Sequence, residues 1–295
     1  MSPVNGFDFT LADILFRVAP PSRVRAITPP DEFALFLTPP GPRVPDAAYS
    51  TRIVDTRLPA DPGEGVFWDN GIWRTRVKAS DRIEIEIYDA RVSCWRTAAH
   101  CSGDFAGGDL LVADEAPALS PSRPLYHPQD RAVILGRICR LGGVMMHSSC
   151  VLADGKVMLF VGMSGAGKTT LGRLWREYGG ILLNDERNLL LPNGRGVTAG
   201  ASPWHGEENQ VNPATGPLAA VFFLNQAPSN TLRAMELSES LPRMLTAAFV
   251  PVFIPDGAAA TLEACAAVLE AVPAYELNFT PDVRAVELCR SILRT

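Results

Sequence analysis

The sequence predicts an α/β protein that carries a β-rich N-terminal module, and two observations favour this class. After about residue 125, short apolar runs that suit buried strands alternate with segments of helical spacing. Before that point prolines are frequent and helical periodicity is missing, so strands and loops are expected there. We therefore expect a mainly antiparallel β module over residues 1–124 and an α/β nucleotide-binding domain over residues 125–295.

The N-terminal module is predicted from two neighbouring segments. Residues 81–88 alternate strictly between polar and apolar side chains, which is typical of a half-buried strand. Residues 71–78 are expected to form the neighbouring strand. The stretch 116–124, rich in proline, alanine and serine, predicts the linker to the second domain.

The second domain is expected to alternate strands and helices. Helices are predicted at 128–141, 169–178, 238–248, 258–271 and 282–293. Strands are predicted at 144–152, 156–161, 181–183, 218–224 and 274–279. The strand at 156–161 is followed by a glycine-rich loop and then by a helix, which is the order that a phosphate-binding loop needs.

Residues 162–170 read Gly-Met-Ser-Gly-Ala-Gly-Lys-Thr-Thr, a complete G-x-x-x-x-G-K-[ST] motif. We expect Gly162, Gly165 and Gly167 to adopt positive φ and to let phosphates approach the backbone without a Cβ clash. The N–H groups of the loop and the start of the following helix then form a site for anions. The residues expected to bind the nucleotide are Gly162, Met163, Ser164, Gly165, Ala166, Gly167, Lys168, Thr169 and Thr170.

Lys168 and Thr169 carry the polar side chains with the clearest roles in this loop. The chain has only three lysines, and Lys168 occupies the one position that the motif requires. Its ammonium group is expected to reach the β- and γ-phosphate oxygens, while the Thr169 hydroxyl joins the ligands of Mg²⁺. The motif predicts binding of a nucleoside triphosphate, and turnover is a separate question.

Two adjacent acids, Asp185 and Glu186, are the candidates for the second half of the site. They follow the strand at 181–183, and in a parallel sheet the carboxyl end of that strand lies beside the phosphate loop. Phosphoryl transfer needs a carboxylate for Mg²⁺ and a group that accepts the hydroxyl proton, so the pair suggests one role each. An ordinary solvated pair at a strand end is the alternative. The strand at 218–224 ends in Asn225-Gln226 without a carboxylate, which favours the 185–186 pair.

His147 and the loop at 203–208 are further polar candidates. His147 lies in an apolar strand next to the strand that leads into the glycine loop, so it is either a hydrogen-bonded core histidine or a site residue. The loop reads Pro-Trp-His-Gly-Glu-Glu. Its Trp204, His205 and Glu207 either shape an acceptor pocket or belong to an ordinary surface loop.

Composition excludes several classes. The 295 residues are 47% hydrophobic and allow a substantial core, in one large or two modest domains. The net charge is −5 with both signs well mixed, so no basic stripe predicts nucleic-acid binding. No apolar run approaches the ~20 residues needed to span a bilayer, and no signal peptide is evident, so we expect a cytoplasmic protein. The six scattered cysteines are expected to be core thiols, with disulfides or a zinc site as alternatives.

The order of these motifs resembles one family. Met146-His147, then the glycine loop, then Gly179-Gly-Ile-Leu-Leu-Asn-Asp-Glu-Arg187 resembles the C-terminal catalytic domain of HPr kinase/phosphorylase and its HPr-kinase-like relatives. Those relatives include kinases that phosphorylate lasso-peptide precursors. ATP-dependent phosphoenolpyruvate carboxykinases look similar in the same nucleotide-binding core. The resemblance covers residues 125–292 and is strongest over 144–190.

The resemblance implies a role for each matching residue. His147 would match the active-site histidine, and Asp185 the aspartate that acts as base for a serine hydroxyl. Glu186 stands where the family has its second, metal-binding aspartate, and its longer side chain leaves open which of the two acids is base and which is ligand. With Lys168, these residues form the predicted catalytic set, and Thr169, Asp185 and Glu186 the predicted metal ligands.

The expected function is a kinase that uses ATP and Mg²⁺ to phosphorylate a hydroxyl, in a serine of a peptide or small protein. The N-terminal half and the region after the acids do not match the bifunctional enzyme, so the reverse phosphorylase reaction is not expected. The alternatives are a nucleotide-binding regulatory or scaffold protein without transfer activity, and a carboxykinase-like metabolic enzyme. Relatives often assemble as oligomers, which makes a homo-oligomer an expectation. No nucleic-acid or membrane partner is expected.

Overall fold

The computed structural model describes residues 2, 4–22, 26–55, 57, 65–78, 81–113, 123–206 and 210–293. The chain forms two units, each with its own sheet. The first comprises Met1–Thr10, Ile14–Arg140 and Pro251–Ala258, and the second comprises Leu11–Asp13, Leu141–Val250 and Ala259–Thr295. Most of the linker expected at 116–124 lies outside the described residues.

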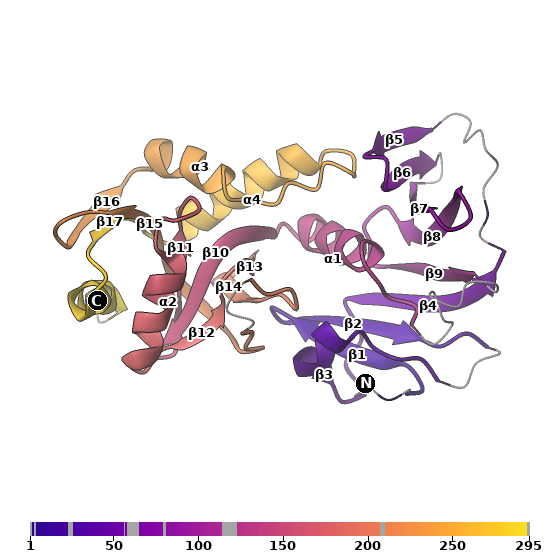
Figure 1. Ribbon diagram of the computed structural model, residues 1–295, viewed down its shortest axis with the longest axis horizontal. Coiled ribbons are helices and arrows are strands. Elements are labelled where there is room, and N and C mark those ends of the chain that lie inside the picture. The colour runs from indigo at the N-terminus through magenta and orange to yellow at the C-terminus, as the bar shows by residue number, and fades with distance from the viewer. Residues whose placement is uncertain are drawn as a thin grey trace. The chain divides into compact units, whose positions relative to one another are not determined.

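The first unit is built on a nine-stranded sheet, which Figure 1 shows in indigo and purple. Its strands lie in the order β3-β1-β2-β4-β9-β8-β7-β6-β5. They are β1 (Phe7–Leu11), β2 (Ile14–Ala19), β3 (Leu37–Thr38), β4 (Ala47–Val54), β5 (Val66–Asp69), β6 (Trp73–Lys78), β7 (Arg82–Asp89), β8 (Cys94–Ser102) and β9 (Gly107–Ala113). A 3-10 helix, η1 (Asp31–Phe36), lies between β2 and β3 along the chain.

Strands β6 and β7 confirm the two strands predicted from alternation. They pair antiparallel, with Thr75 opposite Ile85. Two pairings depart from an antiparallel module, because β4 runs parallel to both β2 and β9. Parallel neighbours need a long connection between them, and four strands separate β4 from β9 along the chain. The sheet is therefore larger and more mixed than the alternating segments alone predict.

Helix α1 (Gln129–Arg140) confirms the helix expected at 128–141 and belongs to the first unit. The buried Gln129 side chain donates a hydrogen bond to the carbonyl of Ala98 on β8. The sequence groups this helix with residues 125–295, whereas this buried contact lies in the first unit. The domain boundary between residues 124 and 125 stays a prediction.

The second unit is built on an eight-stranded sheet with the main path β11-β10-β13-β14-β15-β17-β16. Strand β12 pairs with β10, and β11 also pairs with β15. The strands are β10 (Val144–Ala153), β11 (Lys156–Val161), β12 (Ile181–Asn184), β13 (Arg187–Asn193), β14 (Gly196–Ala201), β15 (Thr215–Gln226), β16 (Thr231–Met235) and β17 (Ala274–Phe279). The helices are α2 (Lys168–Glu177), α3 (Leu237–Leu245), α4 (Gly257–Ala271) and α5 (Val283–Leu293).

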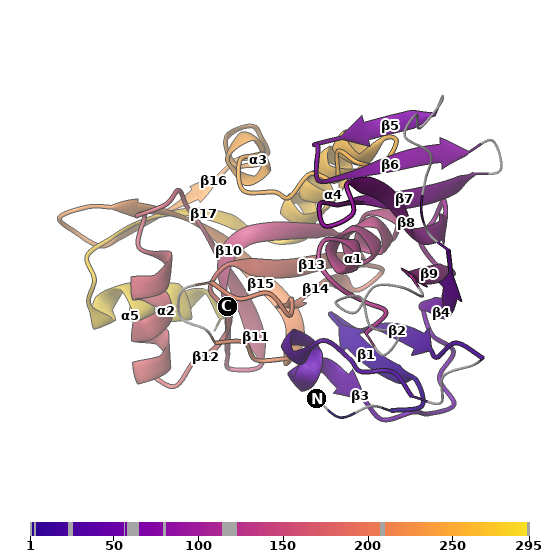
Figure 2. The ribbon, with the colours of Figure 1, turned by 45° about the vertical axis from the view of Figure 1, so that its right-hand side comes forward.

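Helices α2 and α5 pack together on one face of the parallel strands of this sheet (Figure 2). Period-two alternation directs Phe160 of β11 and Phe222 of β15 to this face, where their rings stack with centroids 5.3 Å apart. Trp175 of α2 is fully buried against the same cluster. This core fixes the strand and the helix between which the glycine loop is suspended.

The second half of the chain agrees closely with the sequence. Each strand and helix predicted there is present, with ends shifted by at most a few residues, and the mixed α/β class is confirmed. Three further strands, β13, β14 and β16, were not predicted. None of the helices within the described ranges is long and apolar enough to cross a membrane.

Candidate functional site

The glycine loop, residues Gly162–Thr170, connects the end of β11 at Val161 to α2, whose first residue is Lys168. Gly165 and Gly167 have φ of 78° and 98°, a region that favours glycine. Gly167 is also the N-cap of α2. The loop therefore adopts the strand–loop–helix arrangement that the motif predicts, and it directs the N-terminus of α2 toward the loop's interior.

Gly162 is required for a different reason than the sequence suggests. Positive φ at this glycine was expected, but the positive-φ residues of the loop are Gly165 and Gly167. A Cβ on Gly162 would lie 2.7 Å from the Cβ of Ala166 and 3.3 Å from the Cβ of Leu224. The prediction of positive φ is thus wrong for Gly162. Glycine is needed there because the loop approaches itself and β15 so closely that no side chain fits.

The Lys168 side chain folds back over the loop. Its Nζ donates to the carbonyl oxygens of Gly162 at 2.7 Å and Met163 at 3.2 Å. The residue is only 8% exposed, and this burial lowers the pKa of Lys168. The ammonium group is therefore held at the loop by neutral carbonyls, from which charged phosphate oxygens can draw it.

Gln226, the last residue of β15, supports the loop from the side. Its Nε2 donates to the carbonyl of Gly165 at 2.6 Å. The strand end at Asn225-Gln226 carries no carboxylate, so the sequence favours the 185–186 pair over it. This strand end contributes the Gln226 amide, which holds the loop. No local pattern in the sequence predicts that contact.

The acidic turn, residues Asn184–Arg187, forms the opposite wall. The Asp185 carboxylate is buried and accepts the backbone N–H of Gly206 at 3.1 Å. Glu186 is half-buried and forms an ion pair with Arg187 at 2.7 Å. The two acids thus differ in surroundings, which suits a division into two roles.

Asn184 holds this turn in place and is fully buried. Its Oδ1 accepts the backbone N–H groups of Glu186 at 2.8 Å and Arg187 at 3.1 Å. Its Nδ2 donates to the carbonyls of Ser202 at 3.1 Å and Trp204 at 2.9 Å. One side chain therefore shapes the acidic turn and ties it to the neighbouring loop. Asn184 was not predicted as a site residue, because an asparagine before two acids is a turn signal too common to indicate this role.

The loop at 203–206 contacts the acids through its backbone. Trp204 is buried, His205 is exposed, and Glu207 lies outside the described residues. A Cβ on Gly206 would lie 3.0 Å from Asp185 Oδ1, so the glycine permits the close approach. Gly206 lines the same cavity as the acids, while the suggestion that Trp204, His205 and Glu207 shape an acceptor pocket stays a prediction.

The acids reach the glycine loop by a route other than the predicted one. Strand β12 does not pair with β11; β10 lies between them and is antiparallel to both. Two antiparallel steps leave β11 and β12 pointing the same way, so their carboxyl ends reach the same edge of the sheet. The expected juxtaposition is present, although the parallel pairing invoked for it is not.

His147 lies on β10, opposite Arg187 of β13. Its backbone N–H donates to the carbonyl of Ala247 at 2.7 Å, which fixes the strand at this point. Burial lowers the pKa of His147, and the nearby Lys168 ammonium lowers it further against the pull of Glu186. The imidazole is therefore neutral at neutral pH, in a position that faces charges from both walls.

These residues line one cavity of about 480 Å³, the loop cavity. It brings together predicted site residues from three segments: His147, Ser164, Gly165, Gly167, Lys168, Thr169, Thr170, Asp185 and Glu186. The remaining predicted residues, Gly162, Met163 and Ala166, line an adjoining groove of about 1000 Å³. All twelve predicted residues thus border one of two connected spaces, and Gly206 and Gln226 join them in the loop cavity.

The donor set in the loop cavity fits Mg²⁺ only together with phosphates. Among the described residues, no group of three or more His, Cys, Asp or Glu side chains is arranged to hold a metal ion. Asp185, Glu186 and the Thr169 hydroxyl offer hard oxygen atoms in one cavity. Mg²⁺ typically binds through one or two carboxylates plus substrate phosphates, so this incomplete set is the kind it uses.

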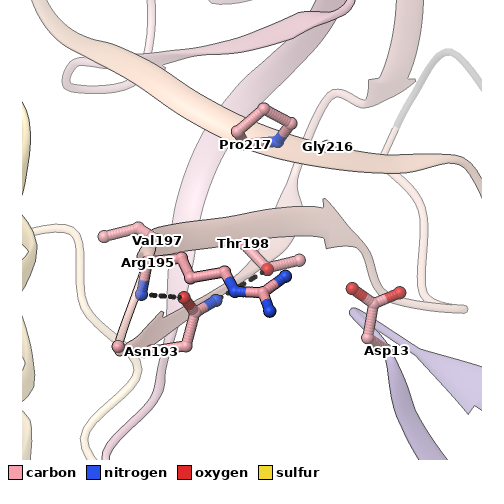
Figure 3. A pocket seen from close by; sticks show the side chains of 8 residues that line it. Asp13, Asn193, Arg195, Val197, Thr198, Gly216 and Pro217 are labelled. Carbon is pink, nitrogen blue, oxygen red and sulfur yellow. Dashed lines mark hydrogen bonds between the residues drawn. The ribbon is translucent and has the colours of Figure 1, made fainter.

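A separate cavity of about 610 Å³ lies at the hairpin between β13 and β14 (Figure 3). Two of its polar side chains shape the turn: Asn193 accepts the backbone N–H of Arg195 at 2.8 Å and donates to Thr198 at 3.0 Å. It shares no lining residue with the loop cavity. We therefore exclude it from the site.

Comparisons with known proteins add little. No model of a known protein family matches the chain, and no curated protein matches it. Among solved structures, the chain is similar to the HPr(Ser) kinase/phosphatase from Coxiella burnetii, with 14% sequence identity and a TM-score of 0.31 over 51% of this chain and 88% of that one. A similarity of this size carries no argument about activity.

Proposed function

We propose that this chain is an ATP- and Mg²⁺-dependent phosphotransferase that moves the γ-phosphate of ATP to a hydroxyl, in a serine of a peptide or small protein. The observation that carries the proposal is the loop cavity, because it unites a phosphate-binding loop with a buried carboxylate. Lys168, Asp185 and His147 all line this one space of about 480 Å³.

The glycine loop supplies the nucleotide-binding half of the proposal. Its N–H groups and the N-terminus of α2 attract the phosphates, and Lys168 neutralises charge that develops on the transferred group. Mg²⁺ held by Glu186, Asp185 and the Thr169 hydroxyl would supply further charge neutralisation and fix the triphosphate. Positioning and charge stabilisation account for most of the catalysis in reactions of this kind.

The acidic turn supplies the base. The acceptor oxygen attacks the γ-phosphorus, and the bond from that phosphorus to the bridging oxygen of the β-phosphate breaks, so that ADP leaves. The proton of the acceptor hydroxyl passes to the carboxylate of Asp185. The hydrogen bond from the Gly206 N–H to this carboxylate, 3.1 Å long, fixes its direction. Neutral His147 stands beside the acids and can hydrogen-bond the acceptor.

Radiolabel transfer tests the proposal. Purified protein is incubated with γ-labelled ATP, Mg²⁺ and a peptide fraction of a cell extract, and label in peptide is separated from free phosphate. We expect Mg²⁺-dependent labelling on serine, with little hydrolysis in the absence of acceptor. Arg195→Ala, in the separate hairpin cavity, is the matched control and should behave like the wild type.

Two outcomes would contradict the proposal. Binding of ATP without transfer to any acceptor would favour a nucleotide-binding regulatory protein. Nucleotide-dependent decarboxylation of oxaloacetate would favour a carboxykinase-like enzyme.

A further inference from the structure

A groove of about 1000 Å³ adjoins the loop cavity and is not used by the proposed chemistry. Its walls are the first half of the glycine loop, the end of β15 and the segment from α3 to Ala247. Four residues line both spaces: His147, Ser164, Gly165 and Gln226. The groove is therefore continuous with the site of transfer.

The position of His147 indicates which of the two substrates, nucleotide or acceptor, the groove would bind. His147 borders both spaces, and the charges of Lys168, Glu186 and Asp185 act on its imidazole. Lys168 and the acids mark the γ-phosphate end of a bound triphosphate, because the motif lysine reaches the β- and γ-phosphates. A group that enters past His147 thus arrives at the transferred phosphate. That is where an acceptor must lie, whereas the nucleotide base extends from the opposite end of the triphosphate.

The groove is mainly apolar. Phe223, Pro242 and Ala247 contribute to its walls, and Met163 of the glycine loop is 84% exposed at its border. Such an exposed methionine is a flexible surface for apolar side chains. Away from the glycine loop, whose N–H groups are assigned to the phosphates of the nucleotide, these walls offer a second phosphate or a dianionic carboxylate little to replace its water.

Among the described residues that line the groove, one arginine is present, and it is already engaged. Arg243 donates to Glu276 at 3.1 Å and to Asn225 at 3.3 Å, and its guanidinium lies 5.0 Å from the centre of the Phe223 ring. No carboxylate belongs to the described residues that line the groove. Neither an acidic nor a basic side chain of a ligand therefore meets a free opposite charge.

We propose that the groove binds the residues next to the phosphorylated hydroxyl of the acceptor, and that it selects uncharged, apolar side chains at those positions. The proposal rests on the phosphotransferase function and adds the class of acceptor. It also accounts for the different polarity of the two adjoining spaces: the polar loop cavity takes the phosphates, and the apolar groove takes the flanking residues.

A charge-swap experiment tests the inference. Thr246 is exposed and lines the groove, so its replacement changes the wall without disturbing the core. Wild-type protein, Thr246→Arg, Thr246→Glu and the conservative Thr246→Ser are assayed with a library of serine peptides of varied flanking residues. Leu262→Glu places the same charge on an exposed position of α4 that does not line the groove, and serves as the control.

We expect the wild type and Thr246→Ser to prefer leucine, methionine or phenylalanine at a flanking position by roughly tenfold or more. Thr246→Arg should shift the preference toward aspartate or glutamate, and Thr246→Glu toward lysine or arginine. Affinity for an ATP analogue should stay within a few-fold, and Leu262→Glu should match the wild type. A gain for charged peptides cannot result from misfolding.

Three results would overturn the inference. Transfer with no preference for the side chains that flank the serine would show that the groove does not bind these residues of the acceptor. The phosphotransferase function would remain supported. A loss of ATP-analogue affinity in both charge variants would assign the groove to the nucleotide base. A failure of all variants and the wild type to label any peptide would remove the proposed function itself.

Discussion

The two walls of the loop cavity are built on opposite principles. Apart from the buried Lys168, the glycine loop acts through its backbone, and hydrogen bonds from Lys168 and Gln226 support it. The acidic turn acts through buried side chains, with Asn184 making four hydrogen bonds in the interior. Such a difference allows the phosphate loop to adjust to its ligand, whereas the carboxylates are held before any ligand arrives.

Pre-organisation of the acids has a clear physical advantage. A base must be at hydrogen-bond distance from the acceptor proton, and a misplacement of about 1 Å can cost about a hundredfold in rate. Phosphate binding to backbone N–H groups tolerates more variation because many donors share the charge. Each wall is therefore expected to respond differently to substitution.

Loss of the loop lysine should have the largest effect. Lys168→Ala removes the one ammonium group found among the described residues of the loop cavity, and we expect γ-phosphate transfer to fall about a thousandfold. Lys156→Ala is the matched control, since its ammonium group donates to Leu293 at the other end of β11. Steady-state transfer assays on the two variants would check this. Equal losses in both would show that the position of the lysine is irrelevant.

Removal of Asn184 should damage the acidic wall. Asn184→Ala leaves buried N–H and carbonyl groups without their partner, so we expect about 1–3 kcal/mol of lost stability. Transfer should fall about 10–100-fold, because the acids lose their support. Urea unfolding and transfer assays measure the two effects.

Asn193→Ala provides the comparison for Asn184→Ala. Asn193 shapes the exposed hairpin turn with similar hydrogen bonds and lies outside the loop cavity. Its loss should leave transfer unchanged. If Asn193→Ala lowered transfer as much as Asn184→Ala, the buried support of the acids would not be the reason.

A smaller effect is expected when the support of the glycine loop is removed. Gln226→Ala removes one exposed hydrogen bond to the Gly165 carbonyl, a loss of about 0.5–1.5 kcal/mol. We expect a two- to tenfold rise in KM for ATP, by roughly that energy, and little change in unfolding. The isosteric Gln226→Glu should bind ATP more weakly still, because it adds a negative charge beside the phosphates. Titration with an ATP analogue measures the three affinities. Binding by Gln226→Glu as tight as that of Gln226→Ala or the wild type would contradict the prediction.

The pH dependence of stability should change least. Because the folded-state pKa of His147 is lowered, the folded protein binds fewer protons than the unfolded chain below the usual histidine pKa of about 6.5. The contribution of neutral His147 to the free energy of unfolding is fully present above about pH 6.5. It is lost as the pH falls toward the lowered folded-state pKa. His147→Gln should therefore show a shallower loss of stability with acid, measured by urea unfolding.

The sequence predicts the glycine wall better than the acidic wall, for a physical reason. The motif from Gly162 to Thr170 is local, so its composition alone reports a loop between strand and helix. The site of Asp185 and Glu186 was also predicted, yet its geometry depends on β10 lying between β11 and β12, which no local pattern encodes. The strand order in the first unit escaped prediction for the same reason.

Residues that support the site were missed because their partners are distant in sequence. Gln226 meets Gly165 across 61 residues, and Asn184 meets Trp204 across 20. A glutamine at a strand end or an asparagine before two acids is too common to single out alone. Gly162 shows the converse case: the motif fixed the residue, but only the structure shows that space, and not φ, requires it.

The central claim is that Asp185 acts as the base of the transfer reaction. The most direct test measures nucleotide binding and phosphate transfer separately in the Asp185→Asn variant. The substitution keeps the shape of the side chain and its ability to accept the Gly206 N–H, but it removes the base. We predict single-turnover γ-phosphate transfer to an acceptor peptide about a thousandfold slower than in the wild type, with affinity for an ATP analogue and Mg²⁺ within tenfold. Transfer within a few-fold of the wild type would contradict the assignment of Asp185 and, with it, the account of the acidic wall.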